Sequence, residues 1–151
     1  MKKLLSRQVK ITLVHYALTD GSSDPTADNV IDMAGYDGVM FIGIVGTITT
    51  TGTATLSIYQ SSDLAVADDY TAISGASAQA SAAALSDRLL VIDIYQPNKR
   101  YLRALLTRAT ANSVWGGTIA IQYQAKDRPI VNAVAAGKLA IAAVALVNST
   151  E

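Results

Sequence analysis

The sequence offers few residues that could perform acid–base or nucleophilic chemistry. It contains one histidine, His15, and no cysteine, which excludes zinc knuckles, iron–sulfur ligation and thiol catalysis. The residue types of a Ser-His-Asp triad are present, but the Gly-x-Ser-x-Gly elbow that presents a nucleophilic serine does not occur. A lone histidine in a predicted strand usually has a structural role, so we expect no catalytic residue.

Residues suited to binding ions or phosphates lack the spacing that such sites need. Asp63, Asp68 and Asp69 lie close together in the sequence, but no glycine-centred loop supplies the oxygen spacing of a calcium site. Gly43 and Gly46 are not followed by the Lys-Ser/Thr pair of a phosphate loop. We therefore expect a solvated turn at the aspartates, and neither a metal nor a cofactor.

The segment Lys99-Arg100-Tyr101-Leu102-Arg103 is the nearest match to a nucleic-acid-binding surface, because basic residues alternate with an aromatic one. In a strand, Tyr101 and Arg103 would point the same way. The formal net charge of the chain is zero, however, which weakens sequence-independent binding to phosphates. We expect these residues to close a sheet edge or to meet an acidic surface of a neighbouring copy, and we expect no nucleic acid.

The charges are sorted along the chain. Residues 1–10, 11–98 and 99–128 carry net charges of +4, −9 and +5. Such segregation could place complementary patches on different faces of one subunit and favour docking between copies or onto a partner. Alternatively, the fold interleaves these segments and the patches disappear.

Composition favours one β-rich domain over the whole of 1–151, with a core over about 8–128. The chain has 151 residues, of which 50% are hydrophobic, and the only glutamate is Glu151, so that nearly all acidic residues are aspartates. Helices favour glutamate on their faces, whereas aspartate prefers turns and caps. Thr, Val, Ile and Tyr are plentiful, as in short strands joined by tight turns.

Alternation and turn residues predict about eight strands, the pattern of a sandwich or barrel. The predicted strands cover residues 8–16, 30–33, 39–48, 53–60, 70–73, 88–96, 101–108 and 115–126. In the first strand, residues 9, 11, 13 and 15 should share one face. In the fourth, Ala54, Leu56 and Ile58 should point inward, while Thr55, Ser57 and Tyr59 point outward.

Other segments punctuate or complicate this pattern. Residues 20–25 and 34–38 are predicted turns, the latter with Gly35 and Gly38 able to take positive φ. Residues 39–48 are almost all apolar and contain Gly43 and Gly46, so they should be buried on both faces or approached closely by another backbone. The stretch 74–86, rich in Ala and Ser, is predicted to be a loop, although its alanines would also permit a short helix.

The two ends of the chain differ from the rest. Residues 130–147 are almost purely aliphatic, interrupted by Asn132, Gly137 and Lys138. Their length suits a membrane span, but a lysine in mid-span costs about 2.5–3.5 kcal/mol, so we expect no membrane and packing on its own sandwich or on another subunit. At the start, the basic residues are not followed by the apolar region of a signal peptide, which predicts a protein made in the cytoplasm.

Four segments resemble small virion structural proteins of tailed bacteriophages, over roughly residues 30–129. These proteins are usually encoded near the major capsid protein, and some serve as head decoration or cement proteins. The segments that carry the resemblance are turns and strand ends: Ala34-Gly35-Tyr36-Asp37-Gly38-Val39-Met40-Phe41, Tyr59-Gln60-Ser61-Ser62-Asp63, Val91-Ile92-Asp93-Ile94-Tyr95-Gln96-Pro97-Asn98-Lys99-Arg100-Tyr101 and Gly117-Thr118-Ile119-Ala120-Ile121-Gln122-Tyr123.

We therefore expect an all-β, jelly-roll-like sandwich with an N-terminal arm and an apolar C-terminal tail, residues 129–151. The resemblance implies a non-enzymatic decoration protein on the capsid surface of the virion. Its partners would be the major capsid protein and copies of itself, with a trimer preferred over a dimer. The alternatives are a head-completion, neck or tail protein, and a carbohydrate-binding module with Tyr36, Tyr59, Tyr95 and Trp115 as a sugar platform.

The residues expected at contacts between subunits are the basic ones of the arm and of the segment after residue 98, together with the aliphatic ones of the tail. They are Lys2, Lys3, Arg7, Lys99, Arg100, Arg103, Ile130, Val131, Val134, Leu139, Ile141, Val144 and Leu146.

Overall fold

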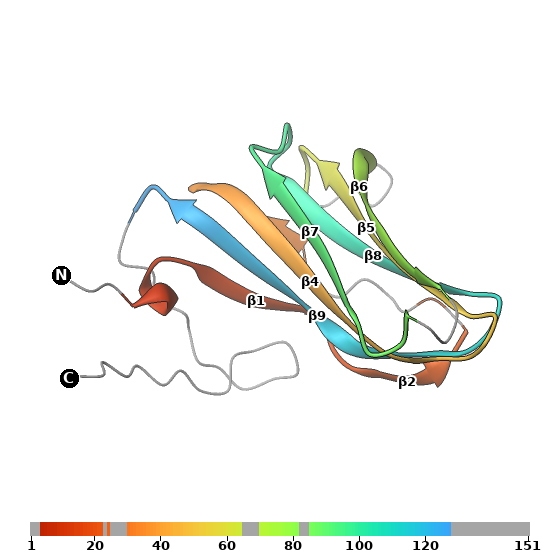
Figure 1. The fold of residues 1–151 in the computed structure, drawn as a ribbon. Helices are drawn as coiled ribbons and strands as arrows, with labels where there is room; N and C mark the ends of the chain where they lie inside the picture. The colour runs from red at the N-terminus through yellow and green to blue at the C-terminus, as the bar shows by residue number, and fades with distance from the viewer. Residues whose placement is uncertain (1–3, 23, 25–29, 65–69, 82–84, 128–151) are drawn as a thin grey trace, which may run out of the picture.

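The computed structural model describes residues 4–22, 24, 30–64, 70–81 and 85–127 (Figure 1). These residues form a short 3-10 helix, η1 (Leu5–Arg7), and nine strands. The strands are β1 (Lys10–His15), β2 (Leu18–Gly21), β3 (Val30–Asp32), β4 (Tyr36–Ile48), β5 (Thr53–Ser61), β6 (Thr71–Ser81), β7 (Leu89–Tyr95), β8 (Tyr101–Ala109) and β9 (Ser113–Ala125).

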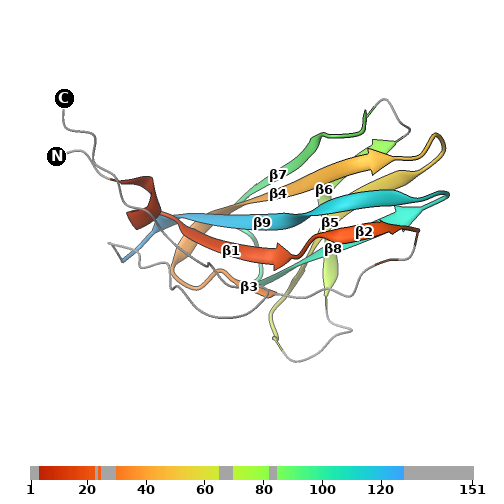
Figure 2. The same ribbon diagram turned by 90° about the horizontal axis from the view of Figure 1, so that it is seen from below.

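The strands form two antiparallel sheets that pack face to face (Figures 1 and 2). Sheet A has the order β1-β9-β4-β7, and β2 also pairs with β9; sheet B has the order β3-β8-β5-β6. The pairs are nested around the β5–β6 hairpin: β4 pairs with β7, β3 with β8 and β1 with β9. This wrapping of paired strands across two sheets is a jelly roll, so the predicted fold class is confirmed.

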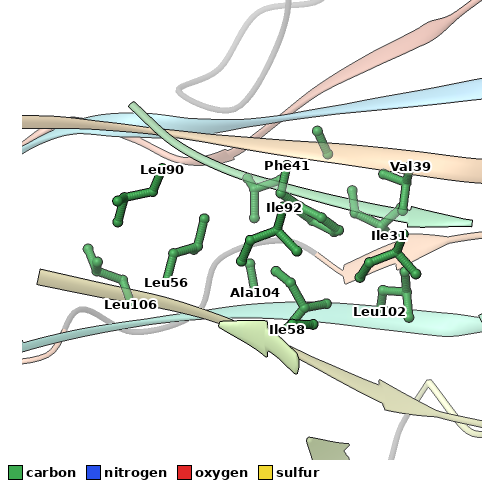
Figure 3. Packing of buried hydrophobic residues seen from close by; sticks show 14 of the residues in the cluster. Ile31, Val39, Phe41, Leu56, Ile58, Leu90, Ile92, Leu102, Ala104 and Leu106 are labelled. Atoms are coloured by element: carbon green, nitrogen blue, oxygen red, sulfur yellow. The ribbon is translucent and has the colours of Figure 1, made fainter. Parts of the chain in front are cut away.

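Alternating side chains of both sheets fill the space between them. In β5, Ala54, Leu56 and Ile58 are fully buried, as the alternation predicts. The close-up in Figure 3 shows the side chains of the two sheets meeting in one apolar layer. The labelled members are Ile31, Val39, Phe41, Leu56, Ile58, Leu90, Ile92, Leu102, Ala104 and Leu106.

Gly43 and Gly46 of β4 make room for side chains, whereas the predicted reason for them was the close approach of another backbone. A Cβ on Gly43 would lie 2.5 Å from the Trp115 ring, and one on Gly46 would lie 2.9 Å from Val114. Trp115 is fully buried, so the missing side chain of Gly43 is what admits the largest ring of the core. Burial of β4 on both faces is wrong for the sandwich, because Ile44 keeps 38% of its surface exposed.

Two polar side chains connect the sheets inside the sandwich. Gln122 of β9 donates through Nε2 to the carbonyl oxygen of Asp32 in β3, at 2.7 Å. Arg108 of β8 is 8% exposed, and its guanidinium donates to the carbonyl oxygens of Thr19 and Ser113 in sheet A. These bonds satisfy groups that would be costly to bury unpaired, and the bond to Thr19 ties β2 to β8 of sheet B.

Several predicted boundaries differ from the structure. The predicted turn at 20–25 begins two residues too early, since Asp20 and Gly21 still belong to β2. The predicted loop at 74–86 is wrong as far as Ser81, because β6 pairs with β5 through Ser81↔Thr53. In the turn at 34–38, Gly35 takes φ +84°, whereas Gly38 already belongs to β4.

The predicted faces of the first strand hold only over part of it. The register between β1 and β9 shifts between Leu13 and His15, a β-bulge. The extra residue lets Val14 and His15 both be buried, at 0% and 1% exposed. Simple alternation predicts opposite faces for these two residues.

The opposite faces of β5 provide a test of this packing. Leu56→Asp places an unpaired charge among core side chains. We expect it to lower the free energy of unfolding by more than about 4 kcal/mol. This loss is comparable with the whole stability of a domain, about 5–15 kcal/mol. We expect the variant to unfold, measured by circular dichroism and thermal denaturation. The matched control is Ser57→Asp, one residue along on the outer face, which should stay folded. A folded Leu56→Asp variant would show that the inward face is assigned incorrectly.

Candidate functional site: the apolar outer face of sheet A

The outer face of sheet A is aliphatic across four strands. The register places Ile121 of β9 beside Met40 of β4 and Ile11 of β1, so that side chains from separate strands form rows. We call this surface the apolar face. It consists of Ile11, Leu13, Met40, Ile42, Ile44, Leu89, Val91, Ile119 and Ile121.

The apolar face is most exposed on β7 and at the neighbouring part of β4. Leu89 is 60% exposed, Val91 50% and Ile44 38%. Contiguous aliphatic surface of this kind usually marks a contact with protein or membrane, because burying it removes apolar area from water.

The outer face of sheet B has a different character. Its outward residues include hydroxyl and amide side chains that bond to one another across strands. Ser57 and Ser77 are joined at 3.0 Å, and Gln79 donates to Thr55 Oγ1 at 2.9 Å. The outer face of sheet B is therefore more polar than that of sheet A, although Leu105 and Tyr59 also lie on it.

One polar bridge crosses the apolar face near its end. Tyr123 of β9 donates its hydroxyl to Asp93 of β7 at 2.7 Å, although β4 lies between these two strands. The ring crosses β4 at Gly38, where a Cβ would lie 2.2 Å from the ring. Asp93 is the one charged residue in β7 and β9. The hydrogen bond from Tyr123 therefore fixes the position of the carboxylate at this end of the apolar face.

The bridge also changes the acidity of the tyrosine. Burial, followed by the hydrogen bond to the Asp93 carboxylate and the negative charge of that group, together raise the pKa of Tyr123 from its usual 10.0 to about 12. Ionisation of Tyr123 would break this bond and place two negative charges side by side.

The predicted basic interface residues that the structure describes take separate partners. Arg100 forms a two-pronged ion pair with Asp32, at 2.8 Å for both hydrogen bonds, and these bonds hold the pKa of that carboxyl below its usual value. Arg103 lies over the ring of Tyr70, 5.7 Å from its centroid. For Arg100 and Asp32, at least, the fold interleaves the basic and acidic segments. Both side chains are exposed, so the pair contributes little, about 0–1 kcal/mol.

Lys99 and Arg7 lie elsewhere in the fold. Lys99 borders a shallow depression of about 350 Å³ at one end of the sandwich, together with Tyr36, Asp37, Arg100 and Lys126 among others. Arg7 belongs to η1, ahead of β1. Lys2, Lys3 and the tail residues from Ile130 to Leu146 lie outside the described residues.

The candidate chemical residues serve the interior where they are described. His15 is buried, with Nδ1 3.0 Å from Thr118 Oγ1, and Trp115 donates its ring N–H to the same hydroxyl oxygen at 3.2 Å. In the described part of the chain, no three His, Asp or Glu residues gather as metal ligands would. Asp68 and Asp69 lie outside it.

One of the four aromatic residues predicted to form a sugar platform is not at the surface. Trp115 is fully buried in the core and offers no ring to a carbohydrate. Tyr95 is 56% exposed on sheet A, whereas Tyr59 lines a hollow of about 200 Å³ with Tyr70 and Arg103 on sheet B. The aromatic residues therefore do not share one surface.

Among the described residues, no helix is long and apolar enough to span a membrane. Residues 130–147, whose length suits a membrane span, lie outside the described residues.

The apolar face was not predicted, although the sequence holds a signal for it. Met40, Ile42 and Ile44 alternate with the inward residues of β4, and Ile119 and Ile121 do the same in β9. A strand with aliphatic residues at both odd and even positions presents apolar side chains on both faces of its sheet. Pairing of the two strands then doubles the width of the surface.

Comparison with known proteins adds little to this geometry. No protein-family model and no curated protein sequence matches the chain. Among solved structures, the chain is similar to one titled "Structure of Eiger TNF from S. frugiperda", with 9% sequence identity and a TM-score of 0.42 over 80% of this chain and 96% of that chain. The class of protein, a jelly-roll β-sandwich, is defined by the strand order itself.

The Tyr123–Asp93 bridge predicts a specific pH dependence. Because the folded pKa of Tyr123 is raised from 10.0 to about 12, its contribution to stability is complete below pH 10 and is lost as the pH rises toward 12. Tyr123→Phe should remove this part of the alkaline loss and the latest step in tyrosinate absorbance. Tyr16→Phe, at an exposed position, should leave both in place. An unchanged late step in Tyr123→Phe would contradict the assignment.

Proposed function

We propose that this protein is a non-enzymatic structural component of a tailed-phage virion, which associates with copies of itself and decorates the exterior of the capsid. The observation that carries the proposal is the apolar face, an aliphatic surface on one sheet of a sandwich whose other sheet has a more polar outer face. The resemblance of residues 30–129 to virion proteins supplies the biological setting.

The proposed action is mechanical. Copies join through the apolar face, and the oligomer, with a trimer preferred, bridges neighbouring subunits of the major capsid protein. A standard protein interface buries about 800 Å² per partner, and simultaneous contacts multiply a modest affinity. Expansion or internal DNA pressure would then have to break these added contacts before the shell opens.

The jelly roll suits this action because its two sheets are locked together. Cross-sheet bonds such as those of Arg108 and Gln122 resist sliding of one sheet over the other. A stiff body transmits force between capsid subunits with little loss of its own conformational entropy. The more polar outer face of sheet B can remain in water while the apolar face is buried.

The number of copies per virion tests the biological role. We expect purified heads to carry on the order of hundreds of copies, as repeated decoration of an icosahedral shell requires, measured by quantitative mass spectrometry and cryo-electron microscopy. About six or twelve copies, the numbers of a symmetric ring, would instead assign the protein to the neck or tail. Complete absence from heads and tails would contradict a virion role.

Substitution on the apolar face tests how copies associate. Ile42→Asp places a charge in the middle of the face, and we expect loss of the oligomer by analytical ultracentrifugation with weaker retention on heads. The matched control is Ser77→Asp on β6, at an exposed position of sheet B, which should leave the oligomer intact. Circular dichroism confirms that both variants fold. An unchanged oligomer in Ile42→Asp would contradict assembly through this face.

A further inference from the structure

We infer that the apolar face is the docking site for the C-terminal segment 130–147 of a second copy of this chain. The inference rests on the proposed self-association and names the element that performs it. The segment lies outside the described residues, so the argument comes from its sequence and from the surface that the structure presents.

The chemistry of the segment matches that of the face. Residues 130–147 are eighteen in number and contain one charged residue, Lys138. The strands β7 and β9 likewise contain one, Asp93. A charge that enters an apolar interface needs an opposite charge beside it, because an unpaired charge loses its hydration with no ion pair to compensate. Asp93 lies on the face itself and is the partner available to Lys138.

The length of the segment fits the face. From Ala125 to Gly117, where β9 pairs with Ile44, eight residues of strand cover about 27 Å at 3.4 Å each. Eighteen residues reach about 27 Å even when coiled as an α-helix, and more when extended. One segment is therefore long enough to cover every row of the face, from the Tyr123–Asp93 bridge to Leu89.

The connection to β9 favours exchange between copies. The backbone N–H of Lys126 donates to the carbonyl oxygen of Gly35 at 2.9 Å, which anchors the chain where it leaves the sandwich. Only Asp127, Arg128 and Pro129 then remain to reverse its direction. A residue before proline is restricted to extended conformations, and a short hinge loop favours swapping of an element between copies. Exchange makes the same contacts in trans and so yields an oligomer.

Disulfide trapping between differently tagged copies tests the inference. The chain contains no cysteine, so Val91→Cys on the face and Ala140→Cys in the segment can be placed in separate full-length chains. After mixing and mild oxidation, we expect a disulfide that joins the two tags. The matched control replaces Val91→Cys with Ser77→Cys on sheet B, which should trap at least about tenfold less.

The doubly substituted chain separates exchange from folding back. With Val91→Cys and Ala140→Cys in one polypeptide, exchange predicts disulfide-linked dimers and larger species on a non-reducing gel. A cross-linked monomer as the main product would overturn exchange, and equal trapping at Val91→Cys and Ser77→Cys would overturn docking on this face. Either result, together with hundreds of wild-type copies on heads, would remove this inference and leave the proposed function intact.

A double-mutant cycle tests the proposed ion pair. Lys138→Glu should weaken self-association at least about tenfold, because it brings two carboxylates together. In the background of Asp93→Asn, which keeps an oxygen to accept the Tyr123 hydroxyl, the same substitution should cost less than about threefold. Equal losses in both backgrounds, measured by analytical ultracentrifugation, would overturn the pairing.

Discussion

The structure depends on one constraint: the central strands of sheet A carry aliphatic side chains on both faces, whereas a two-layer sandwich covers only one. Phe41 and Val39 of β4 point into the core, and Met40 and Ile42 point away from it. The outer face of sheet B is mixed, because hydroxyl and amide side chains such as Ser57 and Gln79 lie on it together with Leu105 and Tyr59. The fold therefore leaves aliphatic side chains of sheet A, such as Leu89 and Val91, in contact with water.

Glycines regulate the packing on both sides of this sheet. On the inner face, Gly43 leaves room for the Trp115 ring, and on the outer face Gly38 leaves room for Tyr123. Each glycine lets a large ring cross a neighbouring strand instead of standing upright between strands. The inner ring fills the core, while the outer one delivers its hydroxyl to Asp93. A side chain at either position would displace a ring, so both faces tolerate little change in volume.

The polar residues that could have suggested chemistry have structural roles where the structure describes them. His15, Thr118 and Trp115 form one buried group, and Arg100 is engaged by Asp32. What distinguishes the surface is the difference between its two sheets. This distribution supports the proposal of a protein that acts by contact, and the virion setting comes from the resemblance in residues 30–129.

The sequence by itself determined the strands with regular alternation and the inward side chains of β5, because a period of two fixes which residues share a face. It failed where long-range pairing overrode local character: β6 continues through the Ala- and Ser-rich stretch to Ser81 because β5 supplies a ladder for it. The bulge that buries Val14 beside His15 and the bridge from Tyr123 to Asp93 were likewise decided only by tertiary structure. Alternation defines two faces of a strand, but which face meets another layer, and which remains uncovered, depends on strands that are distant in the sequence.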